Sequence, residues 1–127
     1  MIQKYLSATL IILFLPNILF AKSEFFQEGI DLYNKSKFKD AKFKFEQDIV
    51  FNPKNEKSYL YLSKIFNEQE KRELEEKNLN TVILLNPKNE EALFELALLK
   101  IRKSNYSETE KLINTFKSVC KKMCSKS

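Results

Sequence analysis

The feature that most constrains this chain is a four-residue peptide that occurs twice at a fixed distance. The sequence Asn-Pro-Lys-Asn at 52–55 returns letter for letter at 86–89, an offset of 34 residues. A period of this length is typical of repeat architectures in which each unit is one supersecondary element. Such a period predicts matching residues at the same offset elsewhere along the chain.

The same period relates positions of matching size along the chain. Large apolar residues align with large ones, and small residues align with small ones. The aligned sets are Phe25, Tyr59 and Leu93; Gly29, Ser63 and Ala97; Leu32 and Phe66; Leu62 and Leu96; and Phe45, Leu79 and Ile113. A small residue lets two helices approach closely, and large neighbours fill the seam between them. The pattern therefore predicts one pair of antiparallel helices per period.

The composition favours helices joined by short polar turns. Gly occurs once and Pro three times in 127 residues, so the usual residues of hairpins and loops are scarce. Pro53 and Pro87 are compatible with the turn before a helix but would break a helix interior. We expect helices at about 23–35, 38–51, 56–69, 72–85, 89–103 and 106–123.

These spacings resemble the signature of the tetratricopeptide repeat (TPR) family. The matching residues are Phe25, Gly29, Leu32, Ala41, Phe45 and Pro53, then Tyr59, Leu62, Ser63, Phe66, Leu79 and Pro87, then Leu93, Leu96, Ala97 and Ile113. The resemblance implies an all-α solenoid of three helical hairpins stacked as a right-handed superhelix. Its repeats would span 22–55, 56–89 and 90–123, with a short tail at 124–127.

The sequence departs from the family signature at three positions. Glu75 and Thr109 align with the small residue Ala41, and Lys100 aligns with the aromatic Phe66. These departures concern packing within the second and third helix pairs and leave the predicted fold unchanged.

Residues 1–21 differ in composition from the rest of the chain. Lys4 is their only charge, an apolar run follows it, Pro16 interrupts that run, and Ala21 is a small residue at its end. This order is typical of a cleavable secretory signal peptide. The apolar run is shorter than the roughly twenty residues that a helix needs to span a bilayer. We predict an exported protein, periplasmic in the simplest interpretation. The alternative is an inner-membrane protein anchored by residues 5–20.

By resemblance, the first helix of each pair lines the concave side of the stack, where the family binds its partners. The matching positions here are mostly apolar or aromatic: Phe26, Ile30, Tyr33, Leu60, Tyr61, Lys64, Phe94, Leu98 and Ile101. Such a stripe predicts a groove for a partner helix or an extended apolar peptide. Phe26, Tyr61 and Phe94 are the expected anchors, because aromatic residues dominate interface energies. A homodimer interface and ordinary core packing are the alternatives.

Some members of the family bind the C-terminal carboxylate of chaperones with a clamp of Lys, Asn and Arg side chains. The aligned positions in this chain hold Phe26, Ile30, Tyr61, Glu91 and Glu95. A carboxylate would meet apolar groups and two negative charges there, which excludes that function.

Cys120 and Cys124 lie four residues apart near the end of the last predicted helix. A disulfide is the default for such a pair in an exported protein. The spacing also brings the two Cα atoms to roughly 6 Å in a helix. Inert thiols, an interchain disulfide, a redox pair and a Cu(I) site that includes Met123 are the alternatives. Because the chain has no His, we expect no metal and no cofactor.

Catalysis and nucleic-acid binding are both disfavoured. A chain without His, and with a single Gly, lacks the common general base and the phosphate loop. Its 22 basic and 17 acidic residues are mixed in sequence and give a net charge of +5. The sequence has no basic block with interleaved aromatic residues, the pattern that is typical of nucleic-acid binding. We predict a non-enzymatic protein-binding module of the cell envelope, an adaptor or assembly factor. The alternatives are a self-associating structural protein, dimeric through its groove or last helix, and a membrane-anchored repeat protein.

Overall fold

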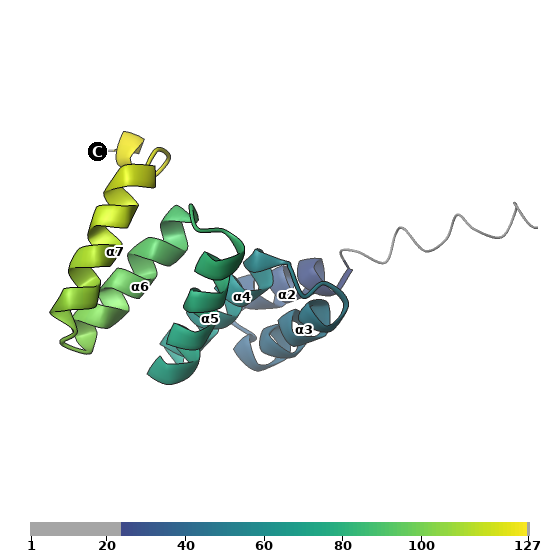
Figure 1. The fold of residues 1–127 in the computed structure, drawn as a ribbon. Helices are drawn as coiled ribbons and strands as arrows, with labels where there is room; N and C mark the ends of the chain where they lie inside the picture. The colour runs from purple at the N-terminus through teal and green to yellow at the C-terminus, as the bar shows by residue number, and fades with distance from the viewer. Residues whose placement is uncertain (1–23, 127) are drawn as a thin grey trace, which may run out of the picture.

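The computed structural model describes residues 24–126, which form paired α-helices and one short 3-10 helix (Figure 1). The elements are α2 Glu24–Asn34, α3 Phe38–Phe51, α4 Glu56–Glu68, α5 Arg72–Leu85, α6 Glu90–Arg102, α7 Tyr106–Val119 and η2 Cys124–Lys126. The predicted signal peptide lies outside the described residues. None of the described helices is long and apolar enough to cross a bilayer.

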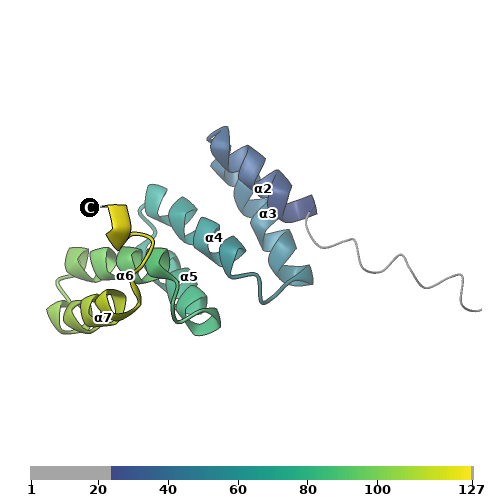
Figure 2. The same ribbon diagram turned by 90° about the horizontal axis from the view of Figure 1, so that it is seen from above.

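Each helix packs mainly on its neighbours in the sequence, which makes the chain a solenoid. The α2–α3 pair lies at one end and the α6–α7 pair at the other, with α4 and α5 between them (Figure 1). Figure 2 shows that the helix axes turn from one pair to the next. The all-α helical-hairpin solenoid predicted from the repeat is confirmed.

The turn inside each pair repeats in backbone detail. Ser36, Glu70 and Ser104 lie 34 residues apart, and each has a positive φ of 55–56°. In each turn this residue donates its N–H to the carbonyl three residues earlier, at 2.8–2.9 Å, and the next residue donates to the carbonyl five residues earlier. These bonds satisfy carbonyls at the end of the first helix. The period therefore governs the backbone as well as the side chains.

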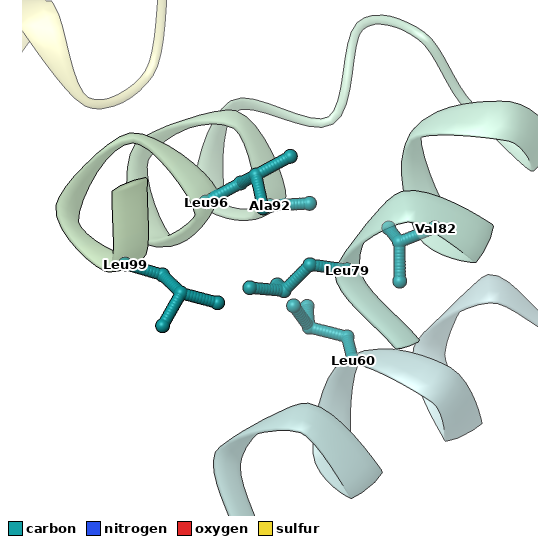
Figure 3. Packing of buried hydrophobic residues seen from close by; sticks show 6 residues of the cluster. All are labelled: Leu60, Leu79, Val82, Ala92, Leu96 and Leu99. Atoms are coloured by element: carbon teal, nitrogen blue, oxygen red, sulfur yellow. The ribbon is translucent and has the colours of Figure 1, made fainter. Parts of the chain in front are cut away.

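Two apolar clusters hold the three pairs together. The first, between the first and second pairs, consists of Ala41, Phe45, Leu62, Ile65 and Phe66. The second brings together residues of α4, α5 and α6 (Figure 3): Leu60, Leu79, Val82, Ala92, Leu96 and Leu99. The size pattern also explains how closely α2 approaches α3 at Gly29, because a Cβ there would lie only 2.6 Å from the Phe45 ring.

The polar residues at signature positions are accommodated by pairing. Glu75 is buried and accepts a 2.7 Å hydrogen bond from Arg102. Thr109 is also buried, and its hydroxyl donates to a backbone carbonyl at 2.8 Å. The buried Lys100 forms ion pairs with Glu76 and Glu108. Because every one of these groups has a partner, the pairs pack without an unsatisfied buried charge.

The two Asn-Pro-Lys-Asn turns begin the next helix pair and bind a carboxylate. Asn55 and Asn89 cap α4 and α6 by accepting backbone N–H bonds. In the first turn, the side chains of Asn52 and Asn55 also donate to the buried carboxylate of Asp48, at 3.1 and 2.6 Å. The equivalent asparagines of the second turn donate instead to Glu56, which begins α4. A carboxylate thus fixes each loop between pairs.

The last pair ends differently, which corrects the predicted helix at 106–123. Helix α7 stops at Val119, and Cys120 has an extended backbone. The loop that follows donates three backbone N–H bonds to Glu90, from Lys121, Lys122 and Met123, at 2.9, 3.1 and 2.8 Å. A disulfide between Cys120 and Cys124, with Cα atoms 5.8 Å apart, closes this loop. Glu90 aligns with Glu56, so the same carboxylate position fixes this loop too.

The seam prediction is wrong at Ile113. This residue aligns with the fully buried Phe45 and Leu79, yet its exposed fraction is 37%. Leu79 is covered by α6 of the following pair, whereas no described helix of a following pair covers α7.

Candidate functional site

The predicted groove residues do not form one uniform surface. Leu60 is only 7% exposed and packs in the second core cluster, so its assignment to the groove is corrected. The central helix α4 has neighbours on both sides, and Leu60 points into the seam with α5 and α6 (Figure 3). The half-buried members of the set pack against the first cluster and are Phe26, Ile30, Tyr33 and Tyr61.

Tyr61 is the centre of an aromatic cluster between the first and second pairs. Its ring stacks on Phe45 at a centroid distance of 5.0 Å and meets the edges of Tyr33 and Phe26 at 5.1 and 6.0 Å. Such contacts stabilise packing beyond the area they bury. Tyr61 and Phe26 therefore serve mainly to join the two pairs, and we call this aromatic cluster the floor of the predicted groove.

Lys64 bridges this floor to the third pair. Its ammonium lies 5.1 Å from the centroid of the Tyr61 ring and 2.6 Å from a carboxylate oxygen of Glu91. Burial alone would lower the pKa of Lys64, but the hydrogen bond and negative charge of Glu91 outweigh it and raise that pKa. Lys64 is therefore charged and committed to an internal pair.

The remaining members of the set form an open strip on α6. Phe94 is 39% exposed, Ile101 is 45% exposed, and Leu98 lies half-buried between them. The spacing of four and three residues puts all three on one helix face. Phe94 is supported from below by Phe116 of α7, at a centroid distance of 6.1 Å. We call Phe94, Leu98 and Ile101 the α6 strip.

Among the clefts that border this helix, two contain both Glu91 and Glu95 and carry more acidic than basic side chains. The first has a volume of about 640 Å³ and includes Phe94, Glu91, Glu95 and Met123. The second, of about 300 Å³, lies against α4 and is lined by Tyr33, Ser63, Lys64, Asn67, Glu68, Glu75, Leu79, Glu91 and Glu95. Glu91 and Glu95 belong to both clefts, so the two clefts adjoin at these residues of α6.

A third cleft, of about 560 Å³, lies at the start of α4 and touches the predicted groove at Phe26. Its wall includes Phe51, whose ring stacks on Phe25 at 5.5 Å and remains largely exposed. Its other walls are the first Asn-Pro-Lys-Asn turn and Lys57. It is therefore a separate apolar depression, away from the α6 strip.

The pKa values of two groups reflect the acidic second cleft. Burial raises the pKa of Tyr33, and the nearby Glu68 and Glu91 raise it further against the lowering effect of Lys64. Burial likewise raises the pKa of Glu75 despite the pairing with Arg102, and Glu95 adds to that rise. Within residues 24–126, no group of three or more His, Cys, Asp or Glu side chains is placed to hold a metal. The arrangement is suited to binding a surface with apolar and basic groups.

Sequence reasoning missed the Glu90 clamp and the acidic rim made by Glu68 and Glu95. The clamp had a signal, because Glu90 aligns with Glu56 at the 34-residue period. The rim had a partial signal, because Glu95 aligns with a groove position, but Glu68 comes from another helix and joins it only after the pairs have stacked.

Neither a family model nor a curated protein matches this sequence. Solved structures do match. The TPR2B domain of yeast Sti1, in a complex with pHsp70, has a TM-score of 0.70 at 16% identity, and the match covers 76% of this chain and 78% of that one. MamA from Desulfovibrio magneticus RS-1 has a TM-score of 0.70 at 15% identity, and the match covers 79% of this chain and 56% of that one. The CopN–Scc3 complex has a TM-score of 0.66 at 16% identity, and the match covers 72% of this chain and 54% of that one.

The chain spans little more than half of the matched MamA and CopN–Scc3 chains. At these identities the matches show the fold alone, which is a TPR-like helical-repeat fold, as predicted.

Proposed function

We propose that this chain is a non-enzymatic protein-binding module that holds a partner segment against the α6 strip. The exposure of Phe94 and Ile101 is the observation that supports this most directly. Neither residue belongs to the two core clusters, and an exposed apolar strip beside a cleft is a common feature of binding surfaces.

The partner segment lies along α6, over the floor made by the aromatic cluster. Phe94 is the main anchor, because its ring is open to the cleft and supported by Phe116. Tyr33 and Lys64 line the second cleft and flank the far side of the segment. Two of the similarly folded structures, Sti1 TPR2B with pHsp70 and CopN–Scc3, are complexes.

The proposed setting is the cell envelope, where the protein acts as an adaptor or assembly factor. The charge and apolar pattern of residues 1–21 supports export to the periplasm. Intact mass of the protein recovered from cells tests this: loss of residues 1–21 supports export with cleavage. An unprocessed mass together with membrane fractionation would instead support the anchored form.

Photo-crosslinking in cells tests the binding surface. A photoreactive phenylalanine replaces Phe94, and the matched control is Tyr106, an exposed aromatic at the start of α7 that lines neither cleft. A discrete heavier band from position 94 alone supports the proposal, and mass spectrometry then names the partner. A band at twice the mass of the chain means a homodimer. No product at 94 would refute the groove as the working surface.

A further inference from the structure

We infer that the segment bound along α6 is amphipathic and cationic, with an apolar side chain seated on Phe94 and a Lys or Arg that pairs with Glu95 or Glu68. The inference rests on the proposed function and adds the chemistry of the partner. The partner is a protein segment, because the exposed apolar strip of α6 lies at helical spacing beside the carboxylates that line the two adjoining clefts.

Helix α6 carries acidic and apolar side chains on one face. Glu91, Glu95 and Leu98 continue the face that carries Phe94, because they lie three or four residues from it or from one another. Glu91 and Glu95 line both clefts, whereas Phe94 lines the first. A segment that touches Phe94 therefore lies beside these carboxylates whichever cleft it follows.

The second cleft carries a negative charge. The whole chain is basic, at +5, yet the charged side chains lining the second cleft are Glu68, Glu75, Glu91, Glu95 and Lys64, a net charge of −3. An acidic depression in a basic protein attracts cationic groups and repels anionic ones.

Two carboxylates of the second cleft are paired within the chain and two are not. Glu91 is paired with Lys64, and Glu75 with Arg102. Among the described residues, no basic side chain pairs with the carboxylates of Glu68 and Glu95, and these carboxylates accept no hydrogen bond. Glu95 is half-buried, whereas Glu68 is exposed at the end of α4. A basic side chain entering the second cleft would pair with these two carboxylates without displacing an internal pair.

The experiment compares two synthetic peptides of about four helical turns with identical leucine positions. One peptide has Lys and the other Glu at the polar positions of the same face, so they differ only in the sign of their charge. Fluorescence anisotropy measures the binding of each to the protein purified from the exported fraction. We expect the Lys peptide to bind at least about tenfold more tightly, with affinity falling as salt is raised.

Charge reversal provides the decisive variant. Glu68→Lys with Glu95→Lys is expected to invert the preference between the two peptides. The matched control, Glu73→Lys with Glu110→Lys, makes the same change in net charge at exposed positions outside both clefts and is expected to keep the wild-type preference. Equal binding of both peptides to the wild type, or an unchanged preference after reversal at Glu68 and Glu95, would overturn the inference.

The crosslink at Phe94 separates the two proposals. If position 94 captures a protein whose crosslinked segment has no Lys or Arg within about one helical turn, the binding surface stands and the cationic partner is refuted. If position 94 captures nothing, the proposed function itself fails. A band at twice the mass of the chain would assign the surface to a second copy.

Discussion

Replacing Gly29 by Ala is expected to destabilise the fold, although Ala is the better helix former. A Cβ at this position would lie 2.6 Å from Cε1, 2.8 Å from Cδ1 and 3.0 Å from Cζ of Phe45. The ring cannot move aside cheaply, because Phe45 is fully buried, stacks on Tyr61 at 5.0 Å and contacts Phe26 at 5.9 Å. One of the two helices must therefore shift.

The magnitude follows from two opposing effects. Overpacking a filled core costs about 1–3 kcal/mol. The change from Gly to Ala inside a helix contributes about 1 kcal/mol in the opposite direction. We expect a net loss of about 1 kcal/mol, which for a domain of this size lowers Tm by roughly 4–8 °C. Thermal unfolding followed by circular dichroism at neutral pH measures this loss.

A second background tests the cause. In Phe45→Leu the ring that meets the new methyl group is gone, so Gly29→Ala is expected to be neutral or stabilising there. The two changes should therefore couple by about 1 kcal/mol or more in a double-mutant cycle. The same Tm change in both backgrounds, or a higher Tm for Gly29→Ala alone, would show that the contact between Gly29 and Phe45 is not what limits the packing.

The other predictions concern buried charge, turn geometry and the C-terminal loop. Burial holds the pKa of Glu75 above its usual range despite Arg102, so its ionised form is disfavoured in the fold. Glu75→Gln should therefore raise Tm at pH 7, and the gain should shrink as pH falls through that pKa and the wild type becomes protonated. A lower Tm for this variant at pH 7 would contradict this reasoning. Ser104 has a φ of 56°, so Ser104→Gly should stabilise by about 0.5–1 kcal/mol in urea unfolding, whereas the same change at Ser107, which lies within α7, should destabilise. Backbone hydrogen bonds from the C-terminal loop lower the pKa of Glu90, so protection of the loop amides from hydrogen exchange should persist at neutral pH and be lost as pH falls through that lowered value. Glu90→Gln, or reduction of the disulfide at Cys120, should speed amide exchange in the loop several-fold and leave α4 and α5 unchanged; equal exchange in all forms would show that neither group holds the loop.

Much of the fold could be predicted from the sequence because its determinants are local or periodic. The repeated turn at 52–55 and 86–89 and the alternation of small and large residues predict where each helix begins and which side it buries. The observed bounds of the first five described helices differ from the predicted ones by one residue at most. Helix formation and helix-pair packing read these short-range patterns directly.

The candidate site was only partly predictable, because its surfaces arise where different pairs meet. Phe94 and Ile101 are exposed as expected, but Leu60 is buried and Tyr61 is committed to an aromatic cluster, since α4 is covered from two sides. No local pattern states which neighbour a central helix will face. The acidic rim depends likewise on stacking that brings Glu68 of α4 near Glu95 of α6.

The end of the last helix shows the division most clearly. Its apolar spacing predicts a helix as far as residue 123, although a disulfide between Cys120 and Cys124 would favour a frayed last turn. The chain instead leaves the helix at Cys120, because the carboxylate of Glu90, some 30 residues earlier, accepts the backbone N–H groups of the loop. The sequence by itself determined the repeat, the helices and the seams, since these depend on contacts within one period. Only the tertiary structure decided which residues of those helices remained open to a partner, because exposure depends on what the neighbouring pair covers.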